Sequence, residues 1–443
     1  MQRSRAVTAV LDAVPVSRTL PWVSAIASVV LASCATDRTR QAPVDREVGI
    51  IAVGDTGYHV GYLDREDYDP PRSHEQFIAA ERADWREDHR PLAEFVAPPT
   101  EILLSNGSVV AASGLRPVAE SIRAWCAGHR CDFGTLLGDN IYPEGATAGA
   151  DGRNDETRFR LLFEEPYGPL AALHPDFRMY ATLGNHDWKT SLAGALSQLR
   201  FFERTAPFYM DGFYYRVRPP GAVGQVELFI VDTELLLART PVPEAAVGED
   251  GSGVRLPDFD EVPEWVVGQS ARAGDMVSWL AAALQSSDAR WKIVVVHHPL
   301  WSSSGSKFVQ AEVIRGLLLP SLCRYADLYL AGHEHTLELH LDDCSKGLPG
   351  VDVPPLPTVV SGAGAKQRPL HRPFAAWQGA TNDELTTLHA TGMVWGFAHV
   401  LLRSDEAEIR LVTTPNDASG RPIEEFAYTV TRRSGHQSEA QQP

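Results

Sequence analysis

The sequence is poor in positive charge. It has 443 residues, with 40 Lys and Arg against 57 Asp and Glu, which gives a formal net charge of −17. Nucleic-acid phosphates and anionic lipid surfaces attract basic faces, so this balance argues against nucleic-acid binding and against polybasic attachment to a membrane. Hydrophobic residues make up 44% of the chain, which is the composition of a globular protein. The length allows about three ordinary domains, or one large enzyme domain with insertions.

The apolar stretch near the N-terminus is too short to cross a membrane. It runs from Leu20 to Ala32, whereas a membrane-spanning helix needs about 20 residues. Arginines precede this stretch and small residues end it, as in a secretory signal. Its last residues, Leu31-Ala32-Ser33-Cys34, resemble a bacterial lipobox, in which the cysteine is lipidated. The alternative is an ordinary signal peptide with a coincidental cysteine.

We therefore expect a lipoprotein signal peptide over residues 1–33, lipidation of Cys34 and a linker over residues 34–46. The mature protein would be an exported bacterial lipoprotein on the periplasmic or cell-surface side of a membrane, held there through its lipid anchor only. Nothing in the sequence indicates a protein partner.

Cysteine is scarce, with five residues in the chain. The cysteines that follow Cys34 are even in number, which in an exported protein suggests disulfide bonds. Their places in the sequence favour the pairs Cys126–Cys131 and Cys323–Cys344, although other connectivities are open. Buried thiols are the alternative, and the spacing is not that of a zinc ribbon.

Short apolar runs alternate with helical patterns through most of the chain. We predict strands at Val48–Val53, Phe133–Leu137, Met179–Leu183, Val226–Val231, Trp291–Val296 and Asp327–Ala331. We predict helices at Arg116–Trp125, Leu192–Glu203, Met276–Leu284 and Val309–Arg324. Near the C-terminus the pattern changes to strands without helices, at Pro357–Ser361, Gly396–Arg403, Glu408–Thr413 and Glu425–Thr431. Two packed sheets flanked by helices would accommodate both the alternating part of the chain and the C-terminal strands, so we expect a layered α/β fold.

Two segments interrupt this alternation. Residues 59–113 contain charged residues and prolines with little periodicity, and residues 239–272 are acidic and rich in proline and glycine. Long loops inside a domain are usually functional or mobile, so we interpret both as insertions in a catalytic domain that spans residues 47–432. The polar tail, residues 433–443, is expected to be disordered.

Five short polar motifs each follow an apolar run. They are Gly54-Asp55-Thr56-Gly57, Gly138-Asp139-Asn140-Ile141-Tyr142, Gly184-Asn185-His186-Asp187, Val296-His297-His298-Pro299 and Gly332-His333-Glu334-His335. Open α/β sheets bind their ligands at the carboxyl ends of strands. Asp, Asn and His provide the oxygen and nitrogen donors that suit zinc, iron or manganese. Each motif alone is weak, since Gly-Asp-x-Gly is also common in turns, but their shared position predicts one metal site.

In this order, the five motifs resemble the metallophosphoesterase (calcineurin-like) superfamily and, within it, the purple acid phosphatases of the compact, tartrate-resistant type. Tyr142, three residues after Asp139, makes the distinction, because most other members lack a tyrosine ligand at this position. The resemblance extends to Phe229–Thr233, Ser361–Gly364 and Gly396–Ala398. It implies a four-layer α/β/β/α sandwich with two packed mixed sheets and flanking helices.

The resemblance further implies a dinuclear metal centre. A ferric ion would be held by Asp55, Tyr142 and His335, a divalent iron, zinc or manganese ion by Asn185, His297 and His333, and Asp139 would bridge the two. The implied reaction is hydrolysis of phosphate monoesters, with a metal-bound hydroxide attacking phosphorus. The implied substrate is a phosphorylated small molecule or protein.

Three residues are candidates for substrate binding. His186 matches a family histidine that contacts the phosphate or the leaving oxygen, which makes it the candidate catalytic residue, and Asn140 matches a position near the bound phosphate. The family usually has a further histidine after the His-x-Pro motif, where this chain has Ser306 with Lys307 beside it. A lysine can neutralise phosphate but is a poor proton donor at its ordinary pKa. In the alternatives, His186 only orients Asn185, and Lys307 is a solvated loop charge.

Two other functions are open for this set of motifs. The same metals would serve a phosphodiesterase acting on nucleotides or phospholipid headgroups, with the insertions reshaping the pocket. A surface-binding lipoprotein that kept the fold and lost activity is disfavoured, because none of the expected metal ligands is missing. The ratio of monoester to diester hydrolysis separates the first alternative from a phosphatase, and metal-loaded protein without turnover would favour the second.

Overall fold

The computed structural model describes residues 46–62, 72–103, 105, 107–150, 154–238, 271–305, 308–417 and 419–433, without the side chains of residues 271–274. The expected signal peptide, the linker up to residue 45 with Cys34, residues 63–71 and 239–270 of the two insertions, Ser306, Lys307 and residues 434–443 of the tail lie outside the described residues. Arg433, which was expected in the disordered tail, is instead buried and donates to the carbonyls of Pro354 and Cys323. Among the residues that are described, no helix is long and apolar enough to cross a membrane.

The first sheet has seven strands in the order β16-β15-β14-β1-β4-β5-β6. Its parallel half consists of β1 (Val48–Val53), β4 (Phe133–Leu137), β5 (Met179–Thr182) and β6 (Phe208–Tyr209). Its antiparallel half consists of β14 (Trp395–Leu402), β15 (Glu406–Thr414) and β16 (Ile423–Thr431). Because β1, β4 and β5 run parallel, the motifs that follow them lie at one edge of this sheet.

The second sheet also has seven strands, in the order β13-β11-β12-β10-β9-β8-β7. Its parallel strands are β8 (Val226–Val231), β9 (Trp291–Val295), β10 (Leu328–Ala331) and β12 (Leu356–Ser361). The antiparallel strands are β7 (Tyr214–Val217), β11 (Leu337–Asp342) and β13 (Leu385–Thr391). The two remaining motifs follow β9 and β10.

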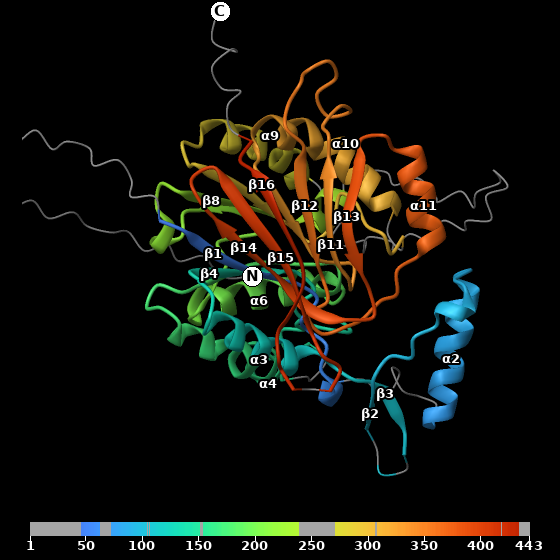
Figure 1. Ribbon diagram of the computed structural model, residues 1–443. Helices are drawn as coiled ribbons and strands as arrows, with labels where there is room; N and C mark the ends of the chain where they lie inside the picture. Colours follow the sequence, from blue (N-terminus) through green and yellow to red (C-terminus); the bar gives the residue numbers. More distant parts are fainter. Residues whose placement is uncertain are drawn as a thin grey trace, which may run out of the picture. The chain divides into compact units, whose positions relative to one another are not determined.

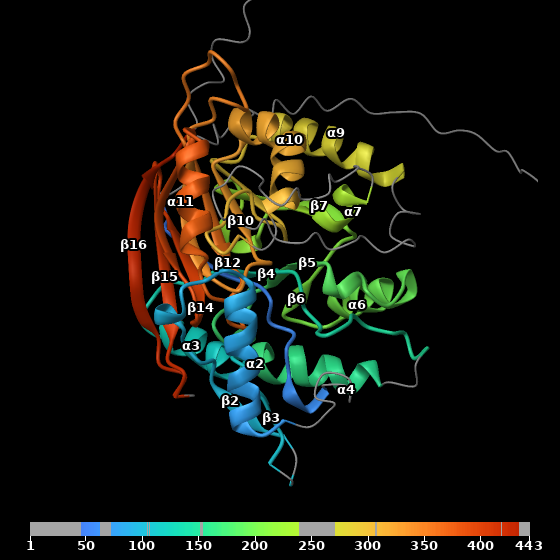
Figure 2. The same ribbon diagram turned by 90° about the vertical axis from the view of Figure 1, so that its right-hand side faces the viewer.

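Helices flank the two sheets (Figures 1 and 2). α3 (Leu115–Cys126) and α6 (Leu192–Arg204) pack on the first sheet, α5 (Glu165–Tyr167) packs on α3, and α4 (Asp155–Phe159) precedes α5 in the same helical segment. α9 (Ala271–Ser286) packs on the second sheet, and α7 (Thr233–Leu237) and α10 (Phe308–Tyr325) pack against α9 and against each other. The expected fold, two large mixed sheets with flanking helices, is therefore confirmed.

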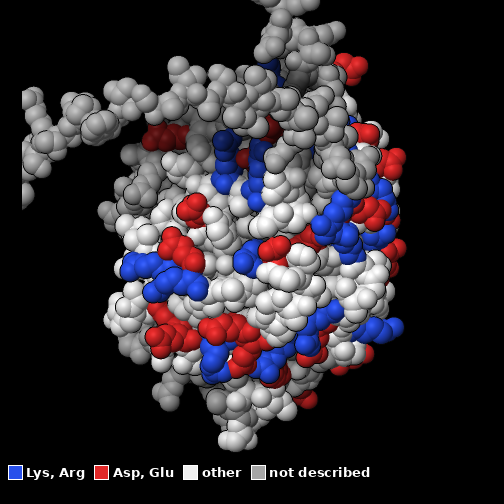
Figure 3. Space-filling model, turned by 90° about the vertical axis from the view of Figure 1, so that its left-hand side faces the viewer, with Lys and Arg blue, Asp and Glu red and all other residues white. Residues whose placement is uncertain are grey.

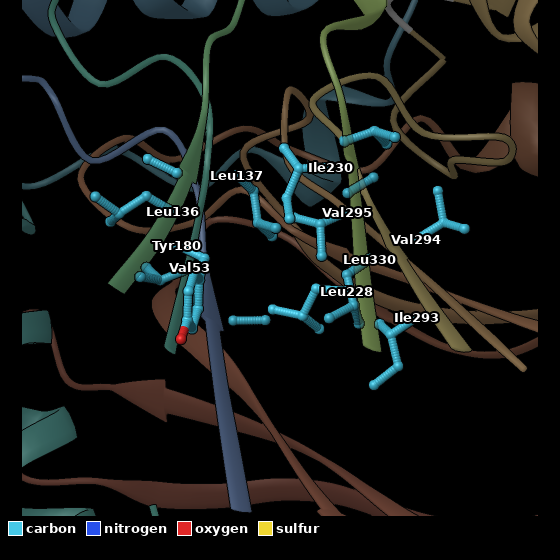
Figure 4. Close-up of a cluster of buried hydrophobic side chains, with 14 of the residues drawn as sticks. Val53, Leu136, Leu137, Tyr180, Leu228, Ile230, Ile293, Val294, Val295 and Leu330 are labelled. Atoms are coloured by element: carbon cyan, nitrogen blue, oxygen red, sulfur yellow. The ribbon is translucent and has the colours of Figure 1, made fainter. Parts of the chain in front are cut away.

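Apolar side chains of both sheets form the core. Figure 4 shows Val53 and Leu137 of the first sheet in one cluster with Leu228, Ile230 and Val295 of the second. All of these side chains are fully buried. Parallel strands covered on both faces are continuously apolar, which is why the sequence predicts them well. The core fixes the two sheets against each other, and with them the strand ends that carry the motifs.

The first insertion is more regular than the sequence predicts. It contains α2 (His74–Glu87) and a hairpin of β2 (Thr100–Ile102) and β3 (Val109–Ala111). Only Phe77 and Trp85 are buried on α2, so the helix has almost no apolar period. Ser73 and Gln76 form a capping box, which is the local signal that marks its start.

The expectation of a C-terminal region without helices is also wrong. α11 (Arg372–Thr381) lies between β12 and β13, and its cap is the side chain of His371 rather than a Ser, Thr, Asp or Asn. Nδ1 of His371 accepts from the amide of Phe374, so its Nε2–H donates to the carbonyl of Asp88 at 2.9 Å. This bond ties the end of α2 to the start of α11, and both helices face the viewer in Figure 2.

Disulfide bonds join Cys126 to Cys131 and Cys323 to Cys344, which are the pairs that the sequence favours. The first closes the turn between α3 and β4. The second ties α10 to the segment that follows β11. Both clamp connections outside the region where the motifs meet.

Surface charges of both signs lie interspersed on the face shown in Figure 3. Among the described residues, exposed charges also form ion pairs, such as Arg403 with Glu47 and Arg116 with Glu165. Such exposed pairs contribute little stability each. The expectation that the chain does not bind nucleic acid stays a prediction.

Candidate metal centre

The five motif loops meet where the two sheets adjoin. The amide of Asp55 donates to the carbonyl of Gly138 at 2.9 Å, and that of Gly332 donates to the carbonyl of His297 at 3.0 Å. The amide of His333 donates to Oδ2 of Asp55 at 2.7 Å. This last bond joins the loop after β10 of the second sheet to the loop after β1 of the first. The loops therefore hold one another by their backbones as well as by their side chains.

Three of the expected ligands have a left-handed backbone. The φ angles are 57° for Asp55, 51° for Asp139 and 70° for His333. This conformation is uncommon for residues with a Cβ and is often found at functional sites. Gly184 is needed at its position for a similar reason, because a Cβ there would lie 2.3 Å from Oδ1 of Asp139. The loops are thus bent to bring side chains together at close range.

Tyr142 is the centre of one half of the site. Its hydroxyl oxygen lies 2.8 Å from Oδ2 of Asp139, 2.9 Å from Oδ1 of Asp55 and 3.1 Å from Nε2 of His335. A phenol has one proton and can donate to only one of these acceptors. The three residues expected to hold the ferric ion therefore lie with their donor atoms together.

Two histidines and an amide form the other half. Oδ1 of Asn185 lies 3.1 Å from Nε2 of His297 and 3.1 Å from Nδ1 of His333, and these two nitrogens are 2.9 Å apart. Nδ1–H of His297 donates to the carbonyl of Leu137 at 2.8 Å, which leaves the lone pair of Nε2 facing Asn185. The residues expected to hold the divalent ion therefore also converge.

Asp139 lies between the two halves. Its Oδ2 faces Tyr142, and its Oδ1 lies 3.4 Å from Nε2 of His297. Asp139, His297 and His333 form a group whose potential ligand atoms all lie within 4.8 Å of one another. One carboxylate with an oxygen in each half has the geometry that a bridging ligand needs.

The electrostatics of the group favour bound cations. Asp55 and Asp139 are 0% and 2% exposed, and no Lys or Arg among the described residues forms an ion pair with either. Burial and the neighbouring Asp139 hold the pKa of Asp55 well above its usual range, and burial lowers the pKa of His335. Burial also opposes ionisation of Asp139, but His297 and other neighbours outweigh it and lower the pKa of Asp139. Carboxylate, phenol, amide and imidazole donors suit iron, zinc and manganese, so these residues fit two metal ions.

His186 lies at the edge of this group. Its amide donates to Oδ1 of Asp139 at 2.9 Å, and its Nδ1–H donates to the carbonyl of Pro143 at 2.6 Å. Nε2 lies 4.0 Å from Oδ2 of Asp139, and the ring lies 4.4 Å from that of Tyr142. Burial lowers the pKa of His186 to about 4. The ring is thus fixed by its Nδ1 side and presents Nε2 to the site.

Asn140 and Asp187 hold the motif loops together. The carboxylate of Asp187 accepts from the amides of Gly184, Asn140 and Ile141. The side-chain nitrogen of Asn140 donates to the carbonyl of Thr182 at 2.8 Å and to Asp187 at 3.0 Å. Both side chains are fully buried. These bonds give Asn140 a positioning role, and its expected place near the bound phosphate stays a prediction.

The family model for calcineurin-like phosphoesterases matches residues 50–337. The chain belongs to this family. It is 29% identical over 255 residues to purple acid phosphatase 4 of Arabidopsis thaliana, covering 57% of this chain and 61% of that protein. It is also 29% identical over 288 residues to purple acid phosphatase 17 of the same plant, covering 63% of this chain and 70% of the relative. The match to the first of these relatives thus spans less than two thirds of its length. The predicted resemblance to metallophosphoesterases of purple acid phosphatase type is confirmed.

The solved structure of GAP50, the anchor in the inner membrane complex of Plasmodium, has the same fold. Its TM-score is 0.53 at 14% identity, with 88% of this chain and 90% of that chain covered. At this identity the likeness shows the fold alone.

A cavity of about 680 Å³ opens beside the phosphoesterase motifs. Its wall includes His335 and the loop residues Ser304 and Gly305. The first insertion supplies the facing residues, among them Glu81, Asp84, Trp85, Asp88 and Phe95. An insertion that the sequence leaves without structure is therefore part of the surface next to the candidate centre.

Lys366 and Arg368 also line this cavity, and sequence reasoning missed both. They follow β12 in the loop that begins with Ser361–Gly364. Because the segment Ser361–Gly364 is part of the family resemblance, the sequence indicated that this loop lies near the site. It gave no sign that Lys366 and Arg368 within the loop face the cavity. Burial and the neighbouring Arg368 lower the pKa of Lys366 to about 8. Lys307, the lysine that the sequence does single out, lies outside the described residues.

Proposed function

We propose that this calcineurin-like phosphoesterase is a metal-dependent acid phosphatase of the purple type, which hydrolyses phosphate monoesters. The observation that supports this function is the contact of the Tyr142 hydroxyl with Asp55, Asp139 and His335. A tyrosine in this position distinguishes purple acid phosphatases within the superfamily.

The proposed centre follows from the two halves of the site. Asp55, Tyr142 and His335 would hold ferric iron, Asn185, His297 and His333 would hold divalent iron, zinc or manganese, and Asp139 would bridge them. Such a metal pair would supply Lewis acidity toward the phosphoryl group and would lower the pKa of a bound water, which would allow hydrolysis at mildly acidic pH.

His186 is the proposed catalytic side chain. Its Nδ1–H stays on the carbonyl of Pro143, so a proton gained by the ring is held at Nε2, the atom that faces the site. A phosphoryl dianion next to the ring would favour this protonated form. Nε2–H can then donate to a phosphoryl oxygen or to the leaving oxygen, whose charge grows as the bond to phosphorus breaks.

The proposed substrate is a phosphorylated small molecule or an exposed phosphoryl group of a protein. The cavity beside His335 would accept the organic part of this substrate. Its volume of about 680 Å³ is in the range of small-molecule sites.

The test compares an activated aryl phosphate monoester with its diester analogue, from pH 4 to 8, using metal-loaded protein. We expect faster turnover of the monoester, with an acidic optimum. An Asp139→Asn variant purified in the same way controls for contaminating phosphatases. A preference for the diester would make the protein a phosphodiesterase, and metal-loaded protein without turnover of either ester would favour a binding lipoprotein.

We also propose that the mature protein is exported and anchored by a lipid on Cys34, with a centre that meets its substrate outside the cytoplasm. The sequence Leu31-Ala32-Ser33-Cys34 supports the anchor. The two disulfide bonds support an oxidising compartment, because disulfides are rare in the cytosol.

A further inference from the structure

We propose that Lys366 binds the phosphoryl group of the substrate and replaces the charge of the histidine that this chain lacks after its His-x-Pro motif. This role rests on the proposed phosphatase function and adds a substrate-binding residue to it. The ligand class is a phosphate dianion, either free or as the terminal group of a monoester.

The backbone on both sides of Lys366 is fixed against the motif loops. The amide of Gly364 donates to the carbonyl of Gly54 at 3.1 Å, and the amide of Gly114 donates to the carbonyl of Ala365 at 2.9 Å. The amide of Arg368 donates to the carbonyl of His335 at 3.1 Å. The backbone of Lys366 is therefore held in place close to Asp55 and His335, two of the expected metal ligands.

The ammonium group of Lys366 points to the proposed centre. Nζ lies 4.6 Å from the ring centroid of Tyr142 and 5.5 Å from that of Tyr58. Asp55 and Asp139 attract it, but neither forms an ion pair with it. Bound metal ions would neutralise these carboxylates and leave the ammonium group for another anion.

Unlike Lys366, the arginines of the same cavity are paired with carboxylates. The guanidinium of Arg368 is paired with Glu334, and that of Arg90 with Asp88. Lys366 has no hydrogen bond or ion pair among the described residues, although it is partly buried. A partly buried ammonium group without an anion is costly, so an anionic ligand gains more at Lys366 than at a paired arginine.

The loop that carries the histidine in the family faces the same cavity. The amide of Ser303 donates to the carboxylate of Glu338, and Oγ of Ser304 donates to that of Glu334. These buried contacts hold the loop up to Gly305, which lines the cavity together with Lys366. The ammonium group of Lys366 supplies positive charge to this cavity, so its effect should appear mainly in binding of the phosphoryl group.

The test uses Lys366→Met, which keeps the length of the side chain and removes its charge. Calorimetric titration of the metal-loaded protein with inorganic phosphate should show about 10- to 100-fold weaker binding, which is the usual loss for a charge-assisted hydrogen bond. KM for an aryl monoester should rise by a similar factor, while kcat changes less. Lys366→Arg should restore most of the phosphate affinity. Lys346→Met removes a lysine that is paired with Glu384 outside the cavity and serves as the matched control.

Unchanged phosphate affinity and KM in Lys366→Met, with full metal content by elemental analysis, would overturn the assignment. If this variant loses metal, Lys366→Gln is measured in the same way, and unchanged phosphate affinity again overturns it. If the wild-type protein binds phosphate but hydrolyses no ester, the proposed phosphatase function is refuted. The role of Lys366 is still tested in that case, because the phosphate affinities of wild type and Lys366→Met can be compared. A wild-type phosphatase with kinetics and phosphate affinity equal to those of the variant would refute the role of Lys366 alone.

Discussion

Oδ1 of Asp139 and Nε2 of His297 lie 3.4 Å apart, although the two residues follow strands of different sheets. The other oxygen of Asp139 faces the hydroxyl of Tyr142. Asp139 is therefore the side chain through which the two halves of the centre meet. Its position depends on the packing of one sheet on the other, because neither sheet alone brings both partners to it.

Asp139→Asn should lose both metal ions. The substitution keeps the shape of the side chain but removes the negative charge between the two proposed metal positions. Elemental analysis of purified protein should find less than about a tenth of the wild-type metal, since loss of a charged ligand costs several kcal/mol. The exposed Asp288→Asn is the control. Full metal retention in Asp139→Asn would count against a bridging role.

Tyr142→Phe should bleach the visible absorption of the iron-loaded protein. The charge-transfer band of a purple acid phosphatase comes from a tyrosinate bound to ferric iron, and phenylalanine keeps the ring without the oxygen. Thermal unfolding should change little, because the ring contacts with His186 and Lys366 are retained. Tyr180→Phe changes another buried tyrosine on β5 and should keep the colour. An unchanged spectrum in Tyr142→Phe would remove the assignment to the purple type.

The acidic residues of α2 should disfavour substrates with several phosphates. Glu81 and Asp84 line the same cavity as Lys366 and would repel a second or third phosphate. The double substitution Glu81→Gln, Asp84→Asn should lower KM for a nucleoside triphosphate by about 3- to 10-fold relative to an aryl monoester. Glu75→Gln, on the same helix but outside the cavity, controls for general charge. Equal changes for both substrates would mean that α2 does not select by charge.

Asp232 should make stability depend on pH. Burial raises the pKa of Asp232 to about 7, while bonds from the amide of Leu235 and from Nε1 of Trp188 oppose this shift. The folded state thus binds the proton more tightly than the unfolded state, so the contribution of Asp232 to stability falls as pH rises from about 4 to 7.

Asp232→Asn should remove this loss. The free energy of unfolding of Asp232→Asn minus that of wild type should therefore increase as pH rises. The increase is at most about 4 kcal/mol, because each unit by which the pKa of Asp232 is raised corresponds to about 1.4 kcal/mol. Urea unfolding at several pH values measures this difference, and the exposed Asp417→Asn is the control. A difference between variant and wild type that stays constant from pH 4 to 8 would contradict the raised pKa.

Cys34→Ser should release the protein from the membrane fraction of cells that export it. A serine cannot take the lipid, while the rest of the signal is kept. Fractionation with detection of the protein in soluble and membrane fractions measures the effect, and Cys131→Ser, which alters a disulfide instead, controls for loss of a cysteine. Retention of Cys34→Ser in the membrane fraction would refute the lipobox interpretation.

The strands that carry the motifs could be predicted because burial on both faces makes them continuously apolar. β1, β4 and β8 have the bounds that the sequence predicts. β11 was missed because Glu338, His340 and Asp342 interrupt its apolar run. Glu338 and His340 are buried there as partners of each other, 2.9 Å apart, and such pairing cannot be seen in a sequence.

The sequence by itself determined the family, the sandwich of two sheets and the set of candidate ligands, because each ligand is tied to the end of a strand that local apolarity reveals. Only the tertiary structure decided that Asn140 and Asp187 hold loops, that Lys366 lies over Tyr142, and that α2 lines the cavity. These relationships join segments far apart in the chain through hydrogen bonds and charges. Such contacts leave no periodic pattern in the sequence, so they arise only when the packed core brings the segments together.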